Sequence, residues 1–176
     1  LIMMPGAIIG LMKKLKNVQK EYLQSAMFGF NDALVSTTGV IVGVSTGTNN
    51  KQVVVLAGVV TIFVEALSMG SGQYLSSKSA HQLEKSDALK VPILSGVIMF
   101  CSYFLAGLVP LLPIFLLPME YSRNVAIVAA LIGLFILGYL KGKIVNVPPI
   151  RSAIEIFIVG GLATAIGIIA GNLFAV

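Results

Sequence analysis

The sequence predicts an all-α integral membrane protein with five transmembrane helices. Of its 176 residues, 57% are apolar and 11% are charged, against about 45–50% and about 25% in soluble domains. The apolar residues gather in five runs, each long enough to cross a bilayer as a helix of about 20 residues. None shows the short alternating segments of a membrane barrel. The composition excludes a water-soluble enzyme, and the single cysteine, Cys101, excludes a disulfide framework.

The five predicted spans are residues 22–46, 52–76, 91–118, 124–140 and 152–176. The first is interrupted by Asn31 and Asp32, and the second by Glu65. The third carries no charge but contains four prolines, which predict a helix that is tilted or broken near its end. The fifth begins next to Arg151, which is spaced to pair with Glu155 one turn later.

Basic residues are distributed unequally between the connections. Ten lie on one side of the predicted spans and two, Lys51 and Arg123, on the other. The ten are Lys13, Lys14, Lys16, Lys20, Lys78, Lys85, Lys90, Lys141, Lys143 and Arg151. Because basic loops stay in the cytoplasm, the N-terminus is expected there and the C-terminus outside or in a lumen. The membrane thus accounts for the net charge of +5, and no nucleic-acid partner is expected.

The chain divides into two parts at about residue 20. Residues 1–20 combine an apolar helical face with clustered lysines, which is typical of a basic amphipathic helix lying on the membrane surface. The apolar part precedes the basic part, so this is not the pattern of a signal peptide. Residues 21–176 form the predicted five-helix transport domain.

Two of the seven acidic residues fall near the middle of a span. An acid at the centre of a membrane helix costs about 2.5–3.5 kcal/mol, so Asp32 and Glu65 are candidate functional residues. Four acids at span ends or in connections are interpreted as solvated charges: Glu21, Glu84, Asp87 and Glu120.

The two membrane acids are expected at similar depth. Each lies about ten residues from the basic end of its span, or roughly 15 Å at 1.5 Å per residue. Met69 and Gln73 follow Glu65 on the same helix face, and Ser36 follows Asp32 by one turn. Two carboxylates with a thioether favour iron(II), cobalt(II) or manganese(II) over magnesium and calcium. Packing remains an alternative role for Met69, as does a neutral hydrogen-bonded acid for Glu65.

Gly39, Gly43 and Gly47 repeat every four residues along the first span. Such a ridge of small residues allows another helix to approach closely. The spacing leaves open whether that helix belongs to the same chain or to a second subunit.

Two segments resemble a known family. FGFNDALVST (residues 28–37) and ALSMGSGQYLSSKS (residues 66–79) are similar to the first- and second-helix motifs of the vacuolar iron transporter family, which includes yeast calcium-sensitive cross-complementer and nodulin-21-like proteins. The prolines of the third span and GGLA (residues 160–163) fit the same pattern. The resemblance covers roughly residues 22–176.

The resemblance implies a dimer of five-helix subunits that exports iron(II), and often manganese(II), from the cytoplasm in exchange for protons. It implies a pathway near the dimer interface along the first two helices, with metal ligands at Asp32 and Met69. We add Glu65 as a third metal ligand, and Asn31, Ser36 and Gln73 as supporting residues of the pathway. No cofactor is expected.

The sequence departs from the family pattern at three places. Ala33 stands where the family usually has glycine, and Gln73 where it commonly has glutamate. An acid is present instead at Glu65, one turn before Met69. The connection between the second and third spans is about fifteen residues long, so this is a short form without the glutamate-rich cytoplasmic insert of plant and fungal-type members.

Two other readings remain open: a small multidrug-type proton antiporter and a membrane subunit that transports nothing. Enzyme chemistry is not expected, because one histidine and one cysteine offer no nucleophile–base grouping. The expected location is the plasma membrane in a prokaryote and a vacuolar-type membrane in a eukaryote.

Overall fold

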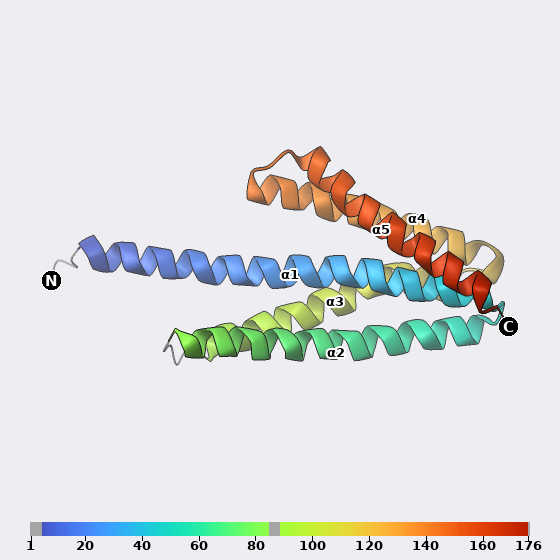
Figure 1. Ribbon diagram of the computed structural model, residues 1–176, viewed down its shortest axis with the longest axis horizontal. Coiled ribbons are helices and arrows are strands. Elements are labelled where there is room, and N and C mark those ends of the chain that lie inside the picture. The colour runs from blue at the N-terminus through green and yellow to red at the C-terminus, as the bar shows by residue number, and fades with distance from the viewer. Residues whose placement is uncertain (1–4, 85–88, 176) are drawn as a thin grey trace.

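The computed structural model describes residues 5–84 and 89–175, with side chains from residue 18 onward. In these parts the chain forms five helices: α1 (Pro5–Gly47), α2 (Lys51–Leu83), α3 (Lys90–Leu116), α4 (Met119–Val145) and α5 (Pro149–Leu173) (Figure 1). All five are long and apolar enough to cross a membrane. The prediction of an all-helical chain with five candidate spans is therefore confirmed.

The helices extend further than the apolar runs. α1 continues without a break from residue 5 through residue 20 into the first span. The predicted amphipathic face of residues 1–20 lies almost wholly outside the described side chains, so that segment's membrane role stays a prediction. α2 runs two turns beyond residue 76, because a helix can continue past the hydrocarbon where its polar side chains reach water.

α3 is a single unbroken helix, although Pro110 and Pro113 lie inside it. Both prolines fall in its last two turns, and each removes one backbone hydrogen bond to the carbonyl four residues before it. Membrane helices tolerate such prolines when neighbouring helices pack around them. Pro110 is fully buried against those neighbours.

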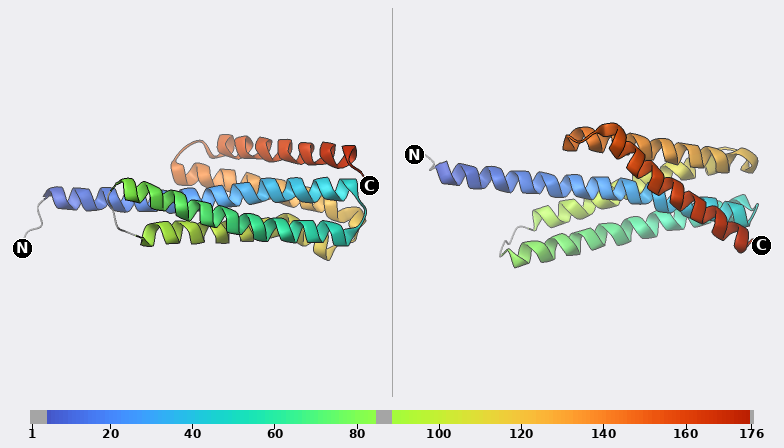
Figure 2. Two further views of the ribbon diagram at one scale, coloured as in Figure 1. Left: turned by 60° about the horizontal axis from the view of Figure 1, so that its bottom comes forward. Right: turned by 45° about the horizontal axis from the view of Figure 1, so that its top comes forward.

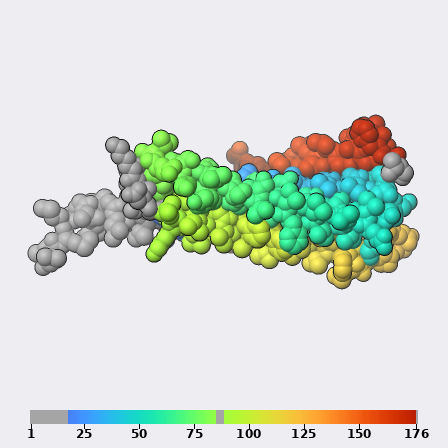
Figure 3. All heavy atoms as spheres, turned by 90° about the horizontal axis from the view of Figure 1, so that it is seen from below, coloured from blue at the N-terminus to red at the C-terminus, as the bar shows by residue number. Residues whose placement is uncertain are grey.

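α1 lies at the centre of the bundle. α2 and α3 pack on one side of it and α4 and α5 on the other, as the three views of Figures 1 and 2 show. Seen from the α2/α3 side, those two helices form most of the surface, with α5 along one edge (Figure 3). We call the end of the bundle near Lys20, Lys78 and Lys141 the basic end, and the other the opposite end.

The packing places small and polar residues inside and large apolar residues outside. Among the residues whose side chains are described, ten serines and threonines are buried, whereas large apolar side chains are exposed along all five helices. An apolar surface of this extent needs an apolar surrounding, which a bilayer provides. The buried apolar residues form two clusters, one around Tyr103 and Ala33 and one around Ile41 and Ile114.

The glycine ridge of α1 packs against α5 of the same chain. A Cβ on Gly43 would lie 3.1 Å from the carbonyl oxygen of Gly167, and one on Gly167 would lie 2.6 Å from that of Gly39. The two backbones are therefore in direct contact. The helix that approaches the glycine ridge therefore belongs to the same chain and not to a second subunit.

Hydrogen bonds tie the helices together at both ends. At the basic end the Glu21 carboxylate accepts hydrogen bonds from the hydroxyls of Ser77 on α2 and Ser95 on α3, the latter at 3.0 Å. Glu21, which the sequence indicated as a solvated charge, is half-buried and also binds two buried serines from other helices. At the opposite end Lys51 Nζ donates to the carbonyl oxygen of Leu117 at 2.9 Å.

Candidate functional site

The candidate site begins with Asp32 on α1 and Glu65 on α2, near the middle of the two helices. Asp32 is half-buried, while Glu65 is exposed on the surface of the single chain. Their carboxylates lie within electrostatic range of each other. The two acids that the sequence singled out thus come from different helices to one region.

Met69 extends this region along α2 toward the basic end. Its side chain is half-buried and packs against the cluster that contains Ala33, Ala66 and Tyr103. Gln73, one turn further, is also half-buried. Because Glu65, Met69 and Gln73 repeat every four residues on one helix, they form a continuous strip of oxygen and sulfur atoms.

Ser36 connects the site to α3. Its hydroxyl lies 2.6 Å from that of Tyr103 and donates to the carbonyl oxygen of Asp32 at 2.7 Å. Tyr103 is fully buried and its ring packs within the bundle core. A buried tyrosine normally places its hydroxyl on a polar partner, and here the partner stands one turn from Asp32.

Sequence reasoning missed Tyr103. Its hydroxyl occurs within an otherwise apolar run, near the middle of the third span. That was a usable signal, because a mid-span hydroxyl must find a partner on another helix. The sequence did not say which helix supplies it.

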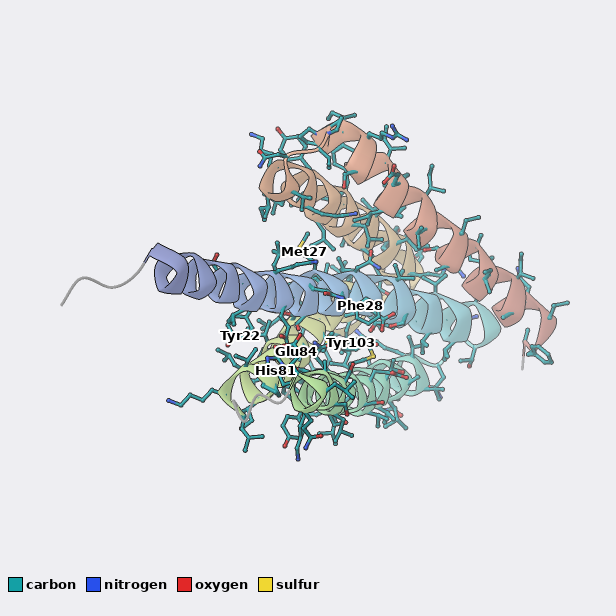
Figure 4. All side chains as sticks on the ribbon, turned by 60° about the vertical axis from the view of Figure 1, so that its left-hand side comes forward. Tyr22, Met27, Phe28, His81, Glu84 and Tyr103 are labelled. Atoms are coloured by element: carbon teal, nitrogen blue, oxygen red, sulfur yellow. The ribbon has the colours of Figure 1, made fainter. Side chains whose placement is uncertain are left out.

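Asn31 lies apart from the other predicted residues. It is half-buried and lines a cavity of about 930 Å³ between α1, α4 and α5. Figure 4 shows the two sides of α1: Met27, which lines the same cavity, lies on the α4/α5 side, and Tyr103 lies toward α2 and α3. The structure therefore brings Asp32, Ser36 and Tyr103 together with the α2 strip, while Asn31 borders the neighbouring cavity.

The ligand set within one chain is small. Among residues 18–84 and 89–175, no three His, Cys, Asp or Glu side chains cluster closely enough to hold a metal ion. Asp32 and Glu65 supply carboxylate oxygens and Met69 a thioether, a set that can hold a divalent ion of intermediate softness. Such a set suits brief contact with a passing ion better than permanent binding of a structural one, because structural sites surround their ion with ligands.

Comparisons with known proteins match nearly the whole chain. The sequence profile of the VIT family matches residues 23–91 and 83–172. The chain is 28% identical over 159 residues to "Vacuolar iron transporter homolog 3" of Arabidopsis thaliana, covering 83% of this chain and 80% of that protein.

Two further relatives carry the name "Vacuolar iron transporter 1". The Arabidopsis thaliana protein is 24% identical over 207 residues and the Eucalyptus grandis protein 23% over the same length, each covering 82% of this chain and 83% of the relative. These alignments span 207 positions, against 159 for the homolog above, while covering a similar share of this chain. These two relatives therefore contain additional residues within the aligned region.

Proposed function

The chain belongs to the VIT family, and from that premise we propose that it exports iron(II) from the cytoplasm in exchange for protons, with manganese(II) as a second substrate. At the level of the family it is an iron-transporting integral membrane protein and not an enzyme. The direction of transport, the coupling to protons and the second metal are parts of the proposal.

The observation that carries the proposal is that Asp32 on α1 and Glu65 on α2 lie close enough for their charges to interact. Two carboxylates in an apolar surrounding repel each other when both are charged, and a proton or a divalent cation relieves that repulsion. The two kinds of ion therefore compete for the same oxygens. Competition of this kind is what an antiporter needs, because binding one ion displaces the other.

We propose that a second copy of the chain completes the site. Glu65 is exposed and Asp32 only half-buried in the single chain, although a bare carboxylate facing lipid is costly. A two-fold dimer that joins the α1/α2 faces would remove both acids from lipid and double the number of ligands. Isolation of a stable monomer that transports metal would contradict this part of the proposal.

The proposed orientation places the basic end in the cytoplasm. The described residues at that end include Lys20, Lys78, Lys90, Lys141, Lys143 and Arg151, against Lys51 and Arg123 at the opposite end. Positively charged loops are retained on the cytoplasmic side. The proposed location is the plasma membrane in a prokaryotic cell and a vacuolar-type membrane in a eukaryotic one.

Transport into proteoliposomes with an acidic interior tests the function. Iron(II) or manganese(II) is added outside under reducing conditions, and uptake is followed with a metal-sensitive dye inside. We expect uptake that requires the protein and slows when a proton ionophore collapses the gradient. Uptake that is unchanged by the ionophore would indicate a channel or uniporter. Equal uptake by liposomes with and without the protein would contradict metal transport.

A further inference from the structure

The cavity between α1, α4 and α5 has the dimensions and the walls of a lipid site. Its volume of about 930 Å³ lies within the range of about 300–1,000 Å³ found for small-ligand sites. On α1 its lining runs from Gln19 to Asn31, which is about 18 Å at 1.5 Å per residue. That length is slightly more than half of a hydrocarbon core of about 30 Å, so the cavity is long enough to accommodate an acyl chain of one leaflet.

The walls of the cavity are mainly apolar below a charged rim, with Gln24 and Asn31 of α1 as polar lining residues. Phe28 on α1, Leu137 on α4 and Val159 on α5 are among the apolar lining residues. Phe28 is 51% exposed and Val159 50% exposed, so these walls face the surroundings of the single chain. An acyl chain of the adjoining leaflet fits this environment because it can cover the apolar side chains without desolvating a charge.

The rim carries two lysines from different helices. Lys20 of α1 and Lys141 of α4 both line the cavity at the basic end. The acid in the lining, Glu155, is held by Arg151, with the Arg151 Nε 3.3 Å from a Glu155 carboxylate oxygen. Because this pair is neutral as a whole, the two lysines leave the rim with an excess of positive charge.

We propose that this cavity binds one anionic phospholipid, with its phosphate between Lys20 and Lys141 and an acyl chain along Phe28, Leu137 and Val159. Basic pockets between membrane helices recognise anionic head groups, and an apolar groove beneath them accepts the chain. The ligand is a lipid of the leaflet at the basic end. This proposal does not depend on which ion the protein transports.

A second copy of the chain fits the cavity less well than a lipid. A two-fold interface joins the same patch of both subunits, so the lysines of one rim would approach those of the other. α2, which carries Glu65 and Met69 and which we propose to face a second copy, lies on the other side of α1 from α4 and α5 (Figure 1). Charge complementarity therefore favours an anionic lipid at this place.

Native mass spectrometry of the purified full-length chain tests the proposal. Phosphatidylglycerol and phosphatidylcholine with identical acyl chains are titrated separately, and the bound lipid per chain is counted. We expect one tightly bound phosphatidylglycerol and weaker binding of phosphatidylcholine. In the double variant Lys20→Gln/Lys141→Gln, phosphatidylglycerol should bind roughly 30-fold more weakly, since each lysine near an anionic lipid contributes about fivefold.

A matched control separates the cavity from general surface charge. Lys78→Gln/Lys143→Gln removes the same two charges from the same end of the bundle, but these lysines lie over the rings of Tyr74 and Tyr139, at 5.7 and 5.3 Å. This variant should bind phosphatidylglycerol as the native protein does. Equal loss in both double variants would overturn the proposal, because it would show diffuse attraction to a basic surface.

Two further variants test the acyl-chain groove and its occupant. Val159→Trp fills the groove and keeps both lysines, so it should lose the tightly bound lipid while its melting temperature stays close to that of the native chain. Retained binding would show that no acyl chain enters. Leu137→Cys in a Cys101→Ser background should not cross-link two chains in membranes; efficient cross-linking would show that a second copy fills the cavity.

Discussion

The hydroxyl of Tyr103 on α3 lies 2.6 Å from the hydroxyl of Ser36 on α1. Ser36 in turn donates to the carbonyl oxygen of Asp32. Since Tyr103 is fully buried, this contact fixes the rotation of α1 relative to α3 one turn from the membrane-embedded acid. Asp32 thus lies one turn from a buried contact between α1 and α3.

Tyr103→Phe should destabilise the protein by about 0.5–1.5 kcal/mol, because it removes one buried hydrogen bond while keeping the ring. The measurement is the free energy of unfolding in detergent. Tyr121→Phe serves as a matched control, since Tyr121 is 59% exposed and should be nearly neutral. Equal effects of the two substitutions would show that the Ser36 contact contributes no stability.

Asp32→Asn should abolish metal uptake and leave folding and assembly intact. The amide has the shape of the carboxylate but can neither hold a divalent cation strongly nor exchange a proton. Proteoliposome flux of iron(II) and manganese(II) measures the effect, with Glu120→Gln at the opposite end of the bundle as the control. Native flux in Asp32→Asn would remove this residue from the site.

Met69→Leu should change which metal is preferred more than it changes stability. Leucine keeps nearly the same volume, so the core cluster around Ala66 should remain packed. The loss of the thioether weakens binding of the softer ion, and the ratio of iron(II) to manganese(II) flux should fall. Met99→Leu, in the core of α3, should leave the ratio unchanged; an unchanged ratio in both would assign Met69 to packing.

Glu65→Gln should lower transport and flatten its dependence on pH. Glutamine can still coordinate through its oxygen but cannot release a proton, so acidification of the receiving side should accelerate the variant less than the native protein. Metal flux measured against pH for both proteins checks this. Superimposable profiles would show that Glu65 is a packing residue and leave Asp32 and Met69 as the core of the site.

Gly167→Ala should destabilise the bundle by about 1–3 kcal/mol, the usual cost of overpacking. The new Cβ would stand 2.6 Å from the backbone oxygen of Gly39, so α5 would have to move away from α1. Gly161→Ala on the same helix has no neighbouring atom within 4 Å and should be neutral or stabilising, because alanine favours a helix by up to about 1 kcal/mol over glycine. Unfolding free energies of the two variants distinguish close packing from helix propensity.

The sequence by itself determined the number of spans, their approximate limits and the family. Each of these depends on the local chain: twenty apolar residues in succession require a helix in a bilayer, whatever surrounds them. Asp32 and Glu65 could be singled out in the same way, because the cost of an acid within a span follows from its own surroundings in the sequence. The predicted helix limits were less accurate. The second apolar run ends at residue 76, where polar residues begin, but the helix α2 continues through residues 77–83.

Only the tertiary structure decided which helices meet. The glycine ridge at Gly39 and Gly43 signals a close approach but not its partner, which proved to be α5. Likewise, the sequence indicates only a charge at a span end for Glu21, whereas in the structure Ser77 and Ser95, on two other helices, donate hydrogen bonds to it. Contacts of this kind join residues more than fifty positions apart. The side chains on the surface of a helix do not depend on which neighbour it packs against. Which helices pack together therefore depends on how the surfaces of all five fit at the same time.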